Sequence, residues 1–471
     1  MGSRDDAAYL PIEDYALIGD GLTGALVSRG GSIDWACFPR FDSPSIFARI
    51  LDARIGGSWA LHPTTGFTST RRYLPDTAIL ETTFTTAHGV AVVLDFMPLT
   101  TDRGSRIVRV IRCRSGRVAF ESIVAPAFDY ARSTSAWLAH GGSVSTAHGE
   151  LVLTLSGDAP HSPAGSTATA RFEVGASEER AFILRCEATL SAPPSTTPPG
   201  VEAQTALDES AARWRAWMAP ITYSGPHRET VRRSALTLKL LDYLPTGAII
   251  AAATTSLPER IGGVRNWDYR YTWLRDTAFT LYAFYVIGHS EESDIFLNWV
   301  MEIARSDPAS LQVMYGLEGE TALAEQALDH LEGYRGSKPV RIGNRAHSQL
   351  QLDIYGEILD CAYLFAKRGG TISLGLWTFL ARIVDFVCDH WQLPDQGIWE
   401  VRSAAQHFVY SKALCWVAVD RGIRIAEGHG HKADLDRWRA TASTIRAEVL
   451  LRGYDAERGS FMQAYDSDQL D

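Results

Sequence analysis

The stretch PHRETVRRSALTLKLLDYL, residues 226–244, is where the spacing of apolar residues changes, and this change decides the fold. Its apolar side chains recur three and four positions apart, for example at Val231, Ala235 and Leu238. That spacing places them on one face of an α-helix. We therefore expect a helix over 229–244 and a helical region from Pro226 onward.

The same spacing continues toward the C-terminus. It predicts six further helices, over 272–288, 290–305, 348–366, 372–391, 409–426 and 432–450. Long segments rich in Gly, Pro and aromatic residues separate them, and such loops often carry function when a scaffold holds them. The resulting seven helices are an odd number for a closed toroid of paired helices.

On the N-terminal side of this stretch, apolar and polar residues alternate in short runs bounded by Gly, Pro or Ser. The runs are ILETTFTT (79–86), VAVVLDFMP (90–98), ELVLTLS (150–156) and RAFILRC (180–186). Alternation with period two is typical of strands, and their close spacing favours antiparallel sheets stacked as a sandwich. The opening segment GALVSRGGSIDWACF (24–38) is expected to join this sheet.

These periods predict a multidomain β + α chain. We expect a β-sandwich over 1–190, a linker and connecting helix over 191–225 that contains SAPPSTTPPG (191–200), and a helical domain over 226–471. A chain of 471 residues is also longer than one hydrophobic core supports.

Composition excludes several classes of partner. The net charge of −10, without a long basic run, excludes nucleic acid. The longest apolar run, GAIIAAA (247–253), is too short to span a bilayer, and the acidic N-terminus does not read as a signal peptide. We therefore expect a soluble, cytoplasmic protein with reduced cysteines. Whether the protein forms a homo-oligomer stays open.

The densest chemical segment is RIGGVRNWDYRYTWLRDTAFTLYAF, residues 260–284. It combines aromatic faces with charged groups, which sugar recognition requires for C–H surfaces and vicinal hydroxyls. The structural alternative is a salt bridge between adjacent charged residues, together with buried aromatic residues. On these residues alone, both interpretations stay open.

A second segment, LPDQGIWEVRSAAQHFVYSKALCWVAVDR (393–421), contains Glu400 between an aromatic residue and a helix rich in large apolar side chains. Partial burial there would raise the pKa of Glu400 and allow it to donate a proton near neutral pH. The alternative is a glutamate on the surface.

A third segment, HLEGYRGSKPVRIGNRAHSQLQLDIYGEIL (330–359), could contact sugar hydroxyls, but it lacks the GxxxxGK[ST] pattern of a phosphate-binding loop.

Several long motifs resemble bacterial members of glycoside hydrolase family 15. They are NWDYRYTWLRD (266–276), EGYRGSKPVRIGN (332–344), QLQLDIYGE (349–357), GIWEVR (397–402) and HFVYSK (407–412). The opening PIEDYALIGDGLTGALVSRGGSIDWACFPRFDSPSIFARILD (11–52) is similar to the N-terminal domain of the trehalase-like branch. The resemblance implies a β-sandwich followed by an (α/α)6-barrel-type helical domain, and an α-glucoside hydrolase that inverts the anomeric centre.

The resemblance also implies roles for individual residues. Glu400 matches the general acid, and Trp399 stands beside it in the pocket wall. Trp273, Arg275 and Asp276 match the residues that hold the non-reducing glucose, and Arg341 and Asn344 those on the leaving-group side. Trp267 and Asp268, in the first segment, and Arg402, in the second, complete the predicted substrate-binding set.

Two departures from the family qualify these expectations. Val401 and Arg402 follow Glu400 where fungal glucoamylases have a second acidic residue, which favours trehalose or a short α-glucoside over starch. An inverting enzyme also needs a second carboxylate as base, and no segment before Asp471 matches the family's base motif. We therefore expect a chain truncated at its C-terminus, an incomplete barrel, and weak or no activity.

Two alternatives to a hydrolase stay open. A phosphorylase on the same toroid needs a single carboxylic acid, although WLRD (273–276) and GIWEVR match hydrolases better. A non-catalytic carbohydrate-binding remnant would also fit the loss of the base. In every case the expected partner is a small carbohydrate. We expect no cofactor, and no metal because HExxH and clustered Cys/His patterns are missing from the sequence.

Overall fold

The computed structural model describes residues 9–99, 104–188, 197–289, 291–303 and 307–471. The chain forms two compact units. Unit 1 comprises Met1–Pro245, Ala252–Arg270 and Gln326–Ile342, and unit 2 comprises Thr246–Ala251, Tyr271–Glu325 and Gly343–Asp471. Each unit combines stretches that are separate in the sequence, whereas the expected domains are continuous. The boundaries expected at 190 and 225 therefore stay a prediction. Most of the expected linker SAPPSTTPPG, residues 191–196, lies outside the described residues.

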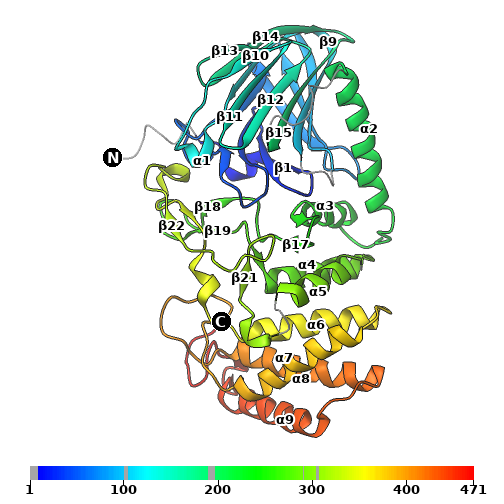
Figure 1. The fold of residues 1–471 in the computed structure, drawn as a ribbon, viewed down its shortest axis with the longest axis vertical. Helices are drawn as coiled ribbons and strands as arrows, with labels where there is room; N and C mark the ends of the chain where they lie inside the picture. The colour runs from blue at the N-terminus through cyan, green and yellow to red at the C-terminus, as the bar shows by residue number, and fades with distance from the viewer. Residues whose placement is uncertain (1–8, 100–103, 189–196, 290, 304–306) are drawn as a thin grey trace. The chain divides into compact units, whose positions relative to one another are not determined.

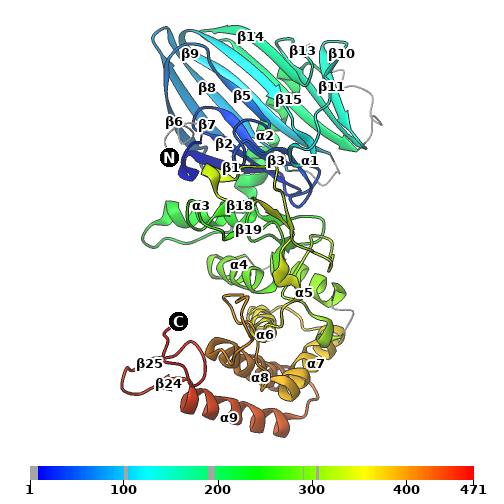
Figure 2. The ribbon, with the colours of Figure 1, turned by 90° about the vertical axis from the view of Figure 1, so that its left-hand side faces the viewer.

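Unit 1 is built on antiparallel strands in two layers that share the long strand β9 (Figures 1 and 2). One layer contains β6 (Phe67–Tyr73), β7 (Leu80–Thr86), β8 (Gly89–Phe96), β9 (Ser105–Ala125), β15 (Glu179–Ala188), β12 (Leu151–Gly157), β11 (Ser143–His148) and β10 (Leu138–His140). The other contains β1 (Tyr15–Gly19), β2 (Gly24–Ser28), β3 (Ser32–Cys37), β4 (Ser45–Phe47), β5 (Ser58–Pro63), the second half of β9, β14 (Thr167–Gly175) and β13 (Ser162–Ala164).

Aromatic side chains hold the two layers face to face. Phe84 on β7 meets Phe120 on β9 with ring centroids 6.2 Å apart, and Phe172 on β14 meets Phe182 on β15 at 5.2 Å. Alternate residues of the strands point outward, and on β8, β9 and β15 helix α2 (Pro199–Met218) covers them. The expected antiparallel sheet domain is therefore confirmed, with every quoted run and the opening segment in a strand. Strands β1, β4, β5 and β6 lie outside the runs that were expected.

The remaining elements of unit 1 are short. They are η2 (Ile12–Asp14), α1 (Phe128–Ala131), α3 (Arg228–Lys239), β16 (Asp242–Tyr243), β18 (Thr255–Pro258), β19 (Asn266–Asp268), β22 (Gln326–Ala327), η4 (Tyr334–Gly336) and β23 (Arg341–Ile342). The helix expected over 229–244 thus ends at Lys239, because the chain becomes extended at Asp242.

Unit 2 is helical. Its helices are α4 (Leu274–Ile287), α5 (Glu291–Ile303), α6 (Asp353–Lys367), α7 (Leu374–His390), α8 (Val409–His429) and α9 (Leu435–Arg452). Helices α4, α6 and α8 pack in sequence as one row, and α5, α7 and α9 as a second row against it (Figure 1). The helical part of the expected fold is therefore confirmed.

Local sequence explains where these helices begin and end. The Ser373 hydroxyl accepts a hydrogen bond from the Leu376 amide and caps α7, and the Asp434 carboxylate caps α9 in the same way. Gly288 ends α4 with a φ of 107°, in the left-handed region that favours glycine. Helix α6 begins at Asp353 instead of the expected 348, because η5 (Arg345–Ser348) ends at Gln349, whose backbone is extended.

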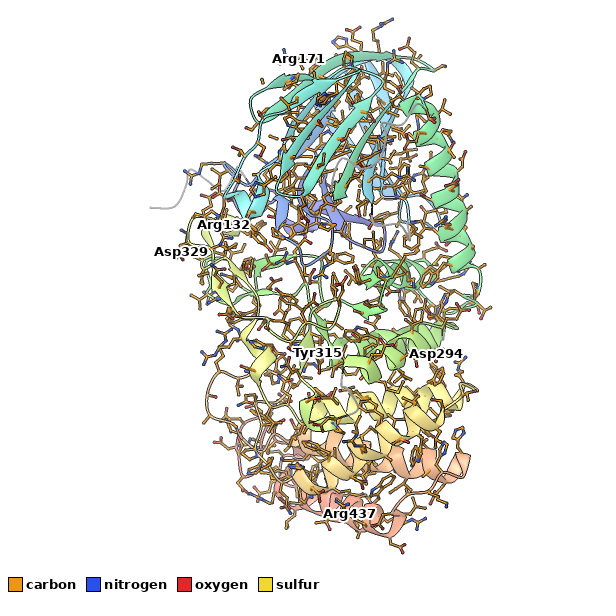
Figure 3. All side chains as sticks on the ribbon, viewed as in Figure 1. Arg132, Arg171, Asp294, Tyr315, Asp329 and Arg437 are labelled. Atoms are coloured by element: carbon orange, nitrogen blue, oxygen red, sulfur yellow. The ribbon has the colours of Figure 1, made fainter. Side chains whose placement is uncertain are left out.

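Short pairings between strands complete unit 2. Strand β20 (Thr272–Trp273) pairs with β21 (Met314–Tyr315) just before α4, and Tyr315 is buried there (Figure 3). This pairing fixes Trp273 at the first turn of α4. The other elements are β17 (Ala248–Ile249), η3 (Pro308–Ser310), β24 (Tyr454–Asp455) and β25 (Ser460–Phe461).

Within the described residues, no helix combines the length and the apolar character that crossing a membrane requires. All six cysteines are free thiols, five of them buried and Cys388 partly exposed.

Candidate active site

The carboxyl group of Glu400 lies at the N-terminal ends of the first helix row in unit 2. The indole Nε1 of Trp273 donates a 2.6 Å hydrogen bond to its Oε1, and Nη2 of Arg275 lies 3.3 Å from the same oxygen. The glutamate side chain is 22% exposed, so one edge stays open to solvent. The segments 266–276 and 397–402, predicted as parts of one site, meet at these contacts.

Arg275 is the centre of a charged cluster. Its guanidinium lies 3.3 Å from Glu400 Oε1, 3.6 Å from Asp353 Oδ2 and 3.8 Å from Asp276 Oδ2. The Asp353 side chain is fully buried, and neither of its carboxylate oxygens has a hydrogen-bond partner among the described residues. Asp276 is 40% exposed and is the member of the cluster most open to a ligand.

The charge balance of this cluster favours a retained proton. Burial raises the pKa of Glu400 above its ordinary range, although Arg275 and the hydrogen bond from Trp273 oppose the rise. Burial also raises the pKa of Asp276, and it raises that of Asp353 to about 6. Because one guanidinium cannot neutralise three carboxylates, the cluster holds a proton more readily than an isolated carboxylate would. Such a group can act as a proton donor.

The loop that carries Glu400 holds the residue in an unusual backbone conformation. Glu400 has a φ of 52°, in the left-handed region that L-residues rarely adopt. Its amide donates to the Gly397 carbonyl at 3.0 Å. Strained conformations of this kind persist where the surrounding structure enforces them, and they cluster at functional sites.

The other predicted residues of unit 2 have varied surroundings. Trp399 is 58% exposed, and its indole donates a hydrogen bond to Asp471. Arg402 pairs with both carboxylate oxygens of Glu325, at 3.2 and 2.6 Å. Asn344 is buried, and its side chain accepts a hydrogen bond from the Ala346 amide at the start of η5.

Three predicted residues belong to unit 1. Asp268 is fully buried and forms a bidentate ion pair with Arg270, the structural alternative considered for this segment. The Arg341 guanidinium lies over the Trp267 ring at 4.6 Å, and the Trp267 indole donates to Glu259. These residues thus lie in unit 1 and the Glu400 cluster in unit 2, and the substrate-binding roles of all predicted residues stay proposals.

Asp353 lies in the segment 330–359, which was predicted as a possible contact to sugar hydroxyls, but it was not among the predicted catalytic or substrate-binding residues. Asp353 lies one helical turn before Glu357, whose Oε1 accepts a 2.7 Å hydrogen bond from the Tyr410 hydroxyl. Burial raises the pKa of Glu357 to about 7. An acidic residue four positions from another, on a helix face that is otherwise apolar, is a signal that could have indicated this cluster.

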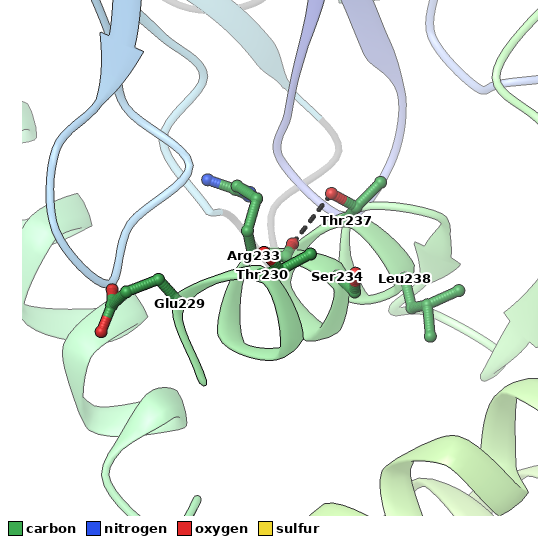
Figure 4. A pocket seen from close by; sticks show the side chains of 6 residues that line it. All are labelled: Glu229, Thr230, Arg233, Ser234, Thr237 and Leu238. Atoms are coloured by element: carbon green, nitrogen blue, oxygen red, sulfur yellow. Dashed lines mark hydrogen bonds between the residues drawn. The ribbon is translucent and has the colours of Figure 1, made fainter. Parts of the chain in front are cut away.

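Surface hollows do not identify the site. A concavity of about 570 Å³ lies along α3 of unit 1. Its lining side chains are drawn in Figure 4, where the dashed line marks the 2.9 Å hydrogen bond from the Thr237 hydroxyl to the Arg233 carbonyl. A hollow of about 590 Å³ in unit 2 is lined by residues of α4, α5, α6 and α8, among them Tyr282 and Arg421. No predicted site residue lines either hollow. Among the described residues, no group of three His, Cys, Asp or Glu side chains is placed to hold a metal ion.

Comparisons with known proteins give the same assignment for both parts of the chain. A family model described as glycosyl hydrolases family 15 matches residues 225–471, and a model described as trehalase-like, N-terminal matches residues 5–208. The chain is 40% identical to a trehalase of Mycolicibacterium smegmatis, over 98% of this chain and 73% of that protein. It is 36% identical to a trehalase of Thermoplasma acidophilum, over 95% of this chain and 77% of that protein.

Among solved structures, a wild-type glycosidase aligns with a TM-score of 0.41 at 18% identity, over 52% of this chain and 63% of that chain. That likeness is too weak to carry an argument.

The sheet domain, the helical domain and these sequence matches together define a glycoside hydrolase. Within that class, the chain belongs to glycosyl hydrolases family 15, because the family model matches more than half of it and the trehalases match along nearly its whole length.

Proposed function

We propose that the chain hydrolyses trehalose to glucose with inversion, and that Glu400 is the general acid. The observation that carries this proposal is the Glu400 carboxyl group, which is partly buried beside a guanidinium that it shares with two other carboxyl groups. The names of the relatives, all described as trehalases, support trehalose as the substrate.

In this mechanism Glu400 gives its proton to the glycosidic oxygen as the bond from C1 to that oxygen breaks. Water attacks C1 from the opposite face of the sugar, activated by a second carboxylate that stays unassigned. Arg275 and Asp276 bind hydroxyls of the glucose, because a guanidinium and a carboxylate together supply donors and acceptors. Trp399 offers an exposed ring to a C–H face of the sugar.

The anomer of the product tests the stereochemistry. Inversion of α,α-trehalose releases one β-glucose from the attacked sugar and one α-glucose as the leaving group. Proton NMR during the first minutes should therefore show both anomers in equal amounts, before they equilibrate. In H₂¹⁸O the label should enter β-glucose. Release of α-glucose alone would contradict inversion, and release of glucose 1-phosphate in phosphate buffer would favour a phosphorylase.

The substrate needs its own test. Trehalose and maltose at equal concentration should be compared by glucose release, with trehalose expected as the better substrate. Faster hydrolysis of maltose would assign the chain to short α-glucans instead. A cytoplasmic location also stays a proposal, supported by six free thiols, and cell fractionation would test it.

A further inference from the structure

Two glutamines connect the side chain of Glu400 to its own backbone. Arg275, which contacts the Glu400 carboxyl through Nη2, donates through Nη1 to Oε1 of Gln351 at 3.1 Å. Gln351 in turn donates from Nε2 to Oε1 of Gln349 at 3.0 Å. Gln349 donates from Nε2 to the carbonyl oxygens of Glu400 and Val401, at 3.3 and 3.2 Å.

The direction of every hydrogen bond in this ring is fixed by chemistry. Arginine can only donate, so the Gln351 oxygen must accept, and its amide nitrogen remains to donate to Gln349. A carboxylate at position 351 could accept from Arg275 but could not donate onward. Gln351 is 1% exposed, so water does not replace it readily.

The ring closes at a strained position. The Gln349 amide holds the carbonyl groups of Glu400 and Val401, and Glu400 has a φ of 52°, a strained conformation that the surrounding structure must enforce. The same ring holds the carboxyl through Arg275. The carboxyl and the backbone of Glu400 are thus fixed relative to each other by side chains from a different segment.

We propose that Gln349 and Gln351 are positioning residues that orient the Glu400 carboxyl. This inference rests on the proposed role of Glu400 as the acid. A displacement of about 1 Å at a reacting group can lower turnover about a hundredfold, so loss of the ring affects the rate more than substrate binding.

The first test is kinetic. Gln351→Ala and Gln349→Ala should each lower kcat on trehalose by roughly 10- to 100-fold, with KM changed less than about threefold. Gln349 is only half-buried, so its variant keeps the test informative if Gln351→Ala does not fold. Unchanged kcat in folded variants of both residues would overturn the proposal.

A double variant separates positioning from other effects. In a Glu400→Gln background, Gln351→Ala should cause a much smaller loss of kcat than in the parent chain, because the acid that the ring positions is already removed. An equal loss in both backgrounds would overturn the positioning role. If Glu400→Gln alone left kcat unchanged, the proposed function would fail instead, and the two failures are therefore distinguishable.

A charge variant gives a readout that does not depend on turnover. Gln351→Glu places another anion beside Arg275, in a cluster that already contains Asp276, Asp353 and Glu400. The Trp273 indole proton, hydrogen-bonded to Glu400, should follow its ionisation by NMR, and the midpoint should move to higher pH.

The matched control is Gln204→Glu on α2. Gln204 also accepts from an arginine, Arg112 at 2.7 Å, and donates to a second side chain, Asp208 at 2.9 Å, but it lies in unit 1. Gln204→Glu should leave unchanged the pH midpoint that is followed through the indole proton of Trp273. The same midpoint in Gln351→Glu and the parent chain would contradict the ring as a link to Glu400.

Discussion

The indole N–H of Trp273 donates a 2.6 Å hydrogen bond to the carboxyl of Glu400 across 127 positions of sequence. A donor to the ionised form stabilises it, so this bond lowers the pKa of Glu400 while burial raises it. The balance between the two sets the pH range over which Glu400 retains its proton.

Replacing Trp273 with Phe removes the donor and keeps an aromatic ring. The pKa of Glu400 should rise, and the basic limb of the pH dependence of kcat/KM should move to higher pH, because the acid stays protonated longer. Trp299→Phe is the control, since that buried indole has no hydrogen-bond partner among the described residues. A basic limb that moves equally in both variants would contradict the assignment.

Glu400→Gln should lower kcat on trehalose by roughly a hundred- to ten-thousandfold, the usual contribution of a positioned acid. The amide still accepts from Trp273, so folding and sugar binding should persist. Calorimetry with trehalose and circular dichroism provide the controls. Turnover equal to that of the parent chain would end the assignment.

Asp353→Asn should change stability in a pH-dependent way. The pKa of Asp353 rises from 3.8 to about 6 on folding. The stability that the protonated side chain gives to the folded protein is therefore fully present below pH 3.8 and is lost as pH rises through 6. Between pH 4 and pH 7, the free energy of unfolding of the variant should therefore increase relative to that of the parent chain, by on the order of 1–3 kcal/mol. Urea denaturation measures this difference.

Asp268→Ala should destabilise the protein by about 3–5 kcal/mol, because it leaves the buried guanidinium of Arg270 without its anion. Glu259→Ala is the matched control: Glu259 also pairs with an arginine, Arg265 at 2.9 Å, but at 41% exposure. The loss of stability in Glu259→Ala should stay below about 1 kcal/mol. If Asp268→Ala instead raised KM at full stability, its predicted sugar-binding role would be favoured over the structural one.

Trp399→Ala should raise KM for trehalose roughly 2- to 10-fold, the equivalent of about 0.5–1.5 kcal/mol of ring contact. Because the ring is 58% exposed, the midpoint of unfolding should change little. An unchanged KM would remove Trp399 from the proposed sugar contacts.

The sequence identified the fold class because periodicity is a local property. The runs ILETTFTT and RAFILRC become β7 and β15, and each of the seven expected helices has a counterpart within the described residues. Ends were less accurate, since the helix expected from 348 begins at Asp353. Gln349 there is extended, and the side chains of Gln349 and Gln351 bond to Glu400 and Arg275, far along the chain, which local spacing cannot register.

The sequence by itself determined the sheet followed by helices, the family, and the residues Trp273, Arg275 and Glu400 as candidates, because these depend on residue type, order and spacing. Only the tertiary structure showed that Asp268 forms an ion pair with Arg270 and that Asp353 lies beside the guanidinium of Arg275. It also showed that Gln349 and Gln351 connect this guanidinium to the backbone of Glu400. The physical reason is that pKa and hydrogen bonding depend on distances and burial between segments, and only folding brings those segments together.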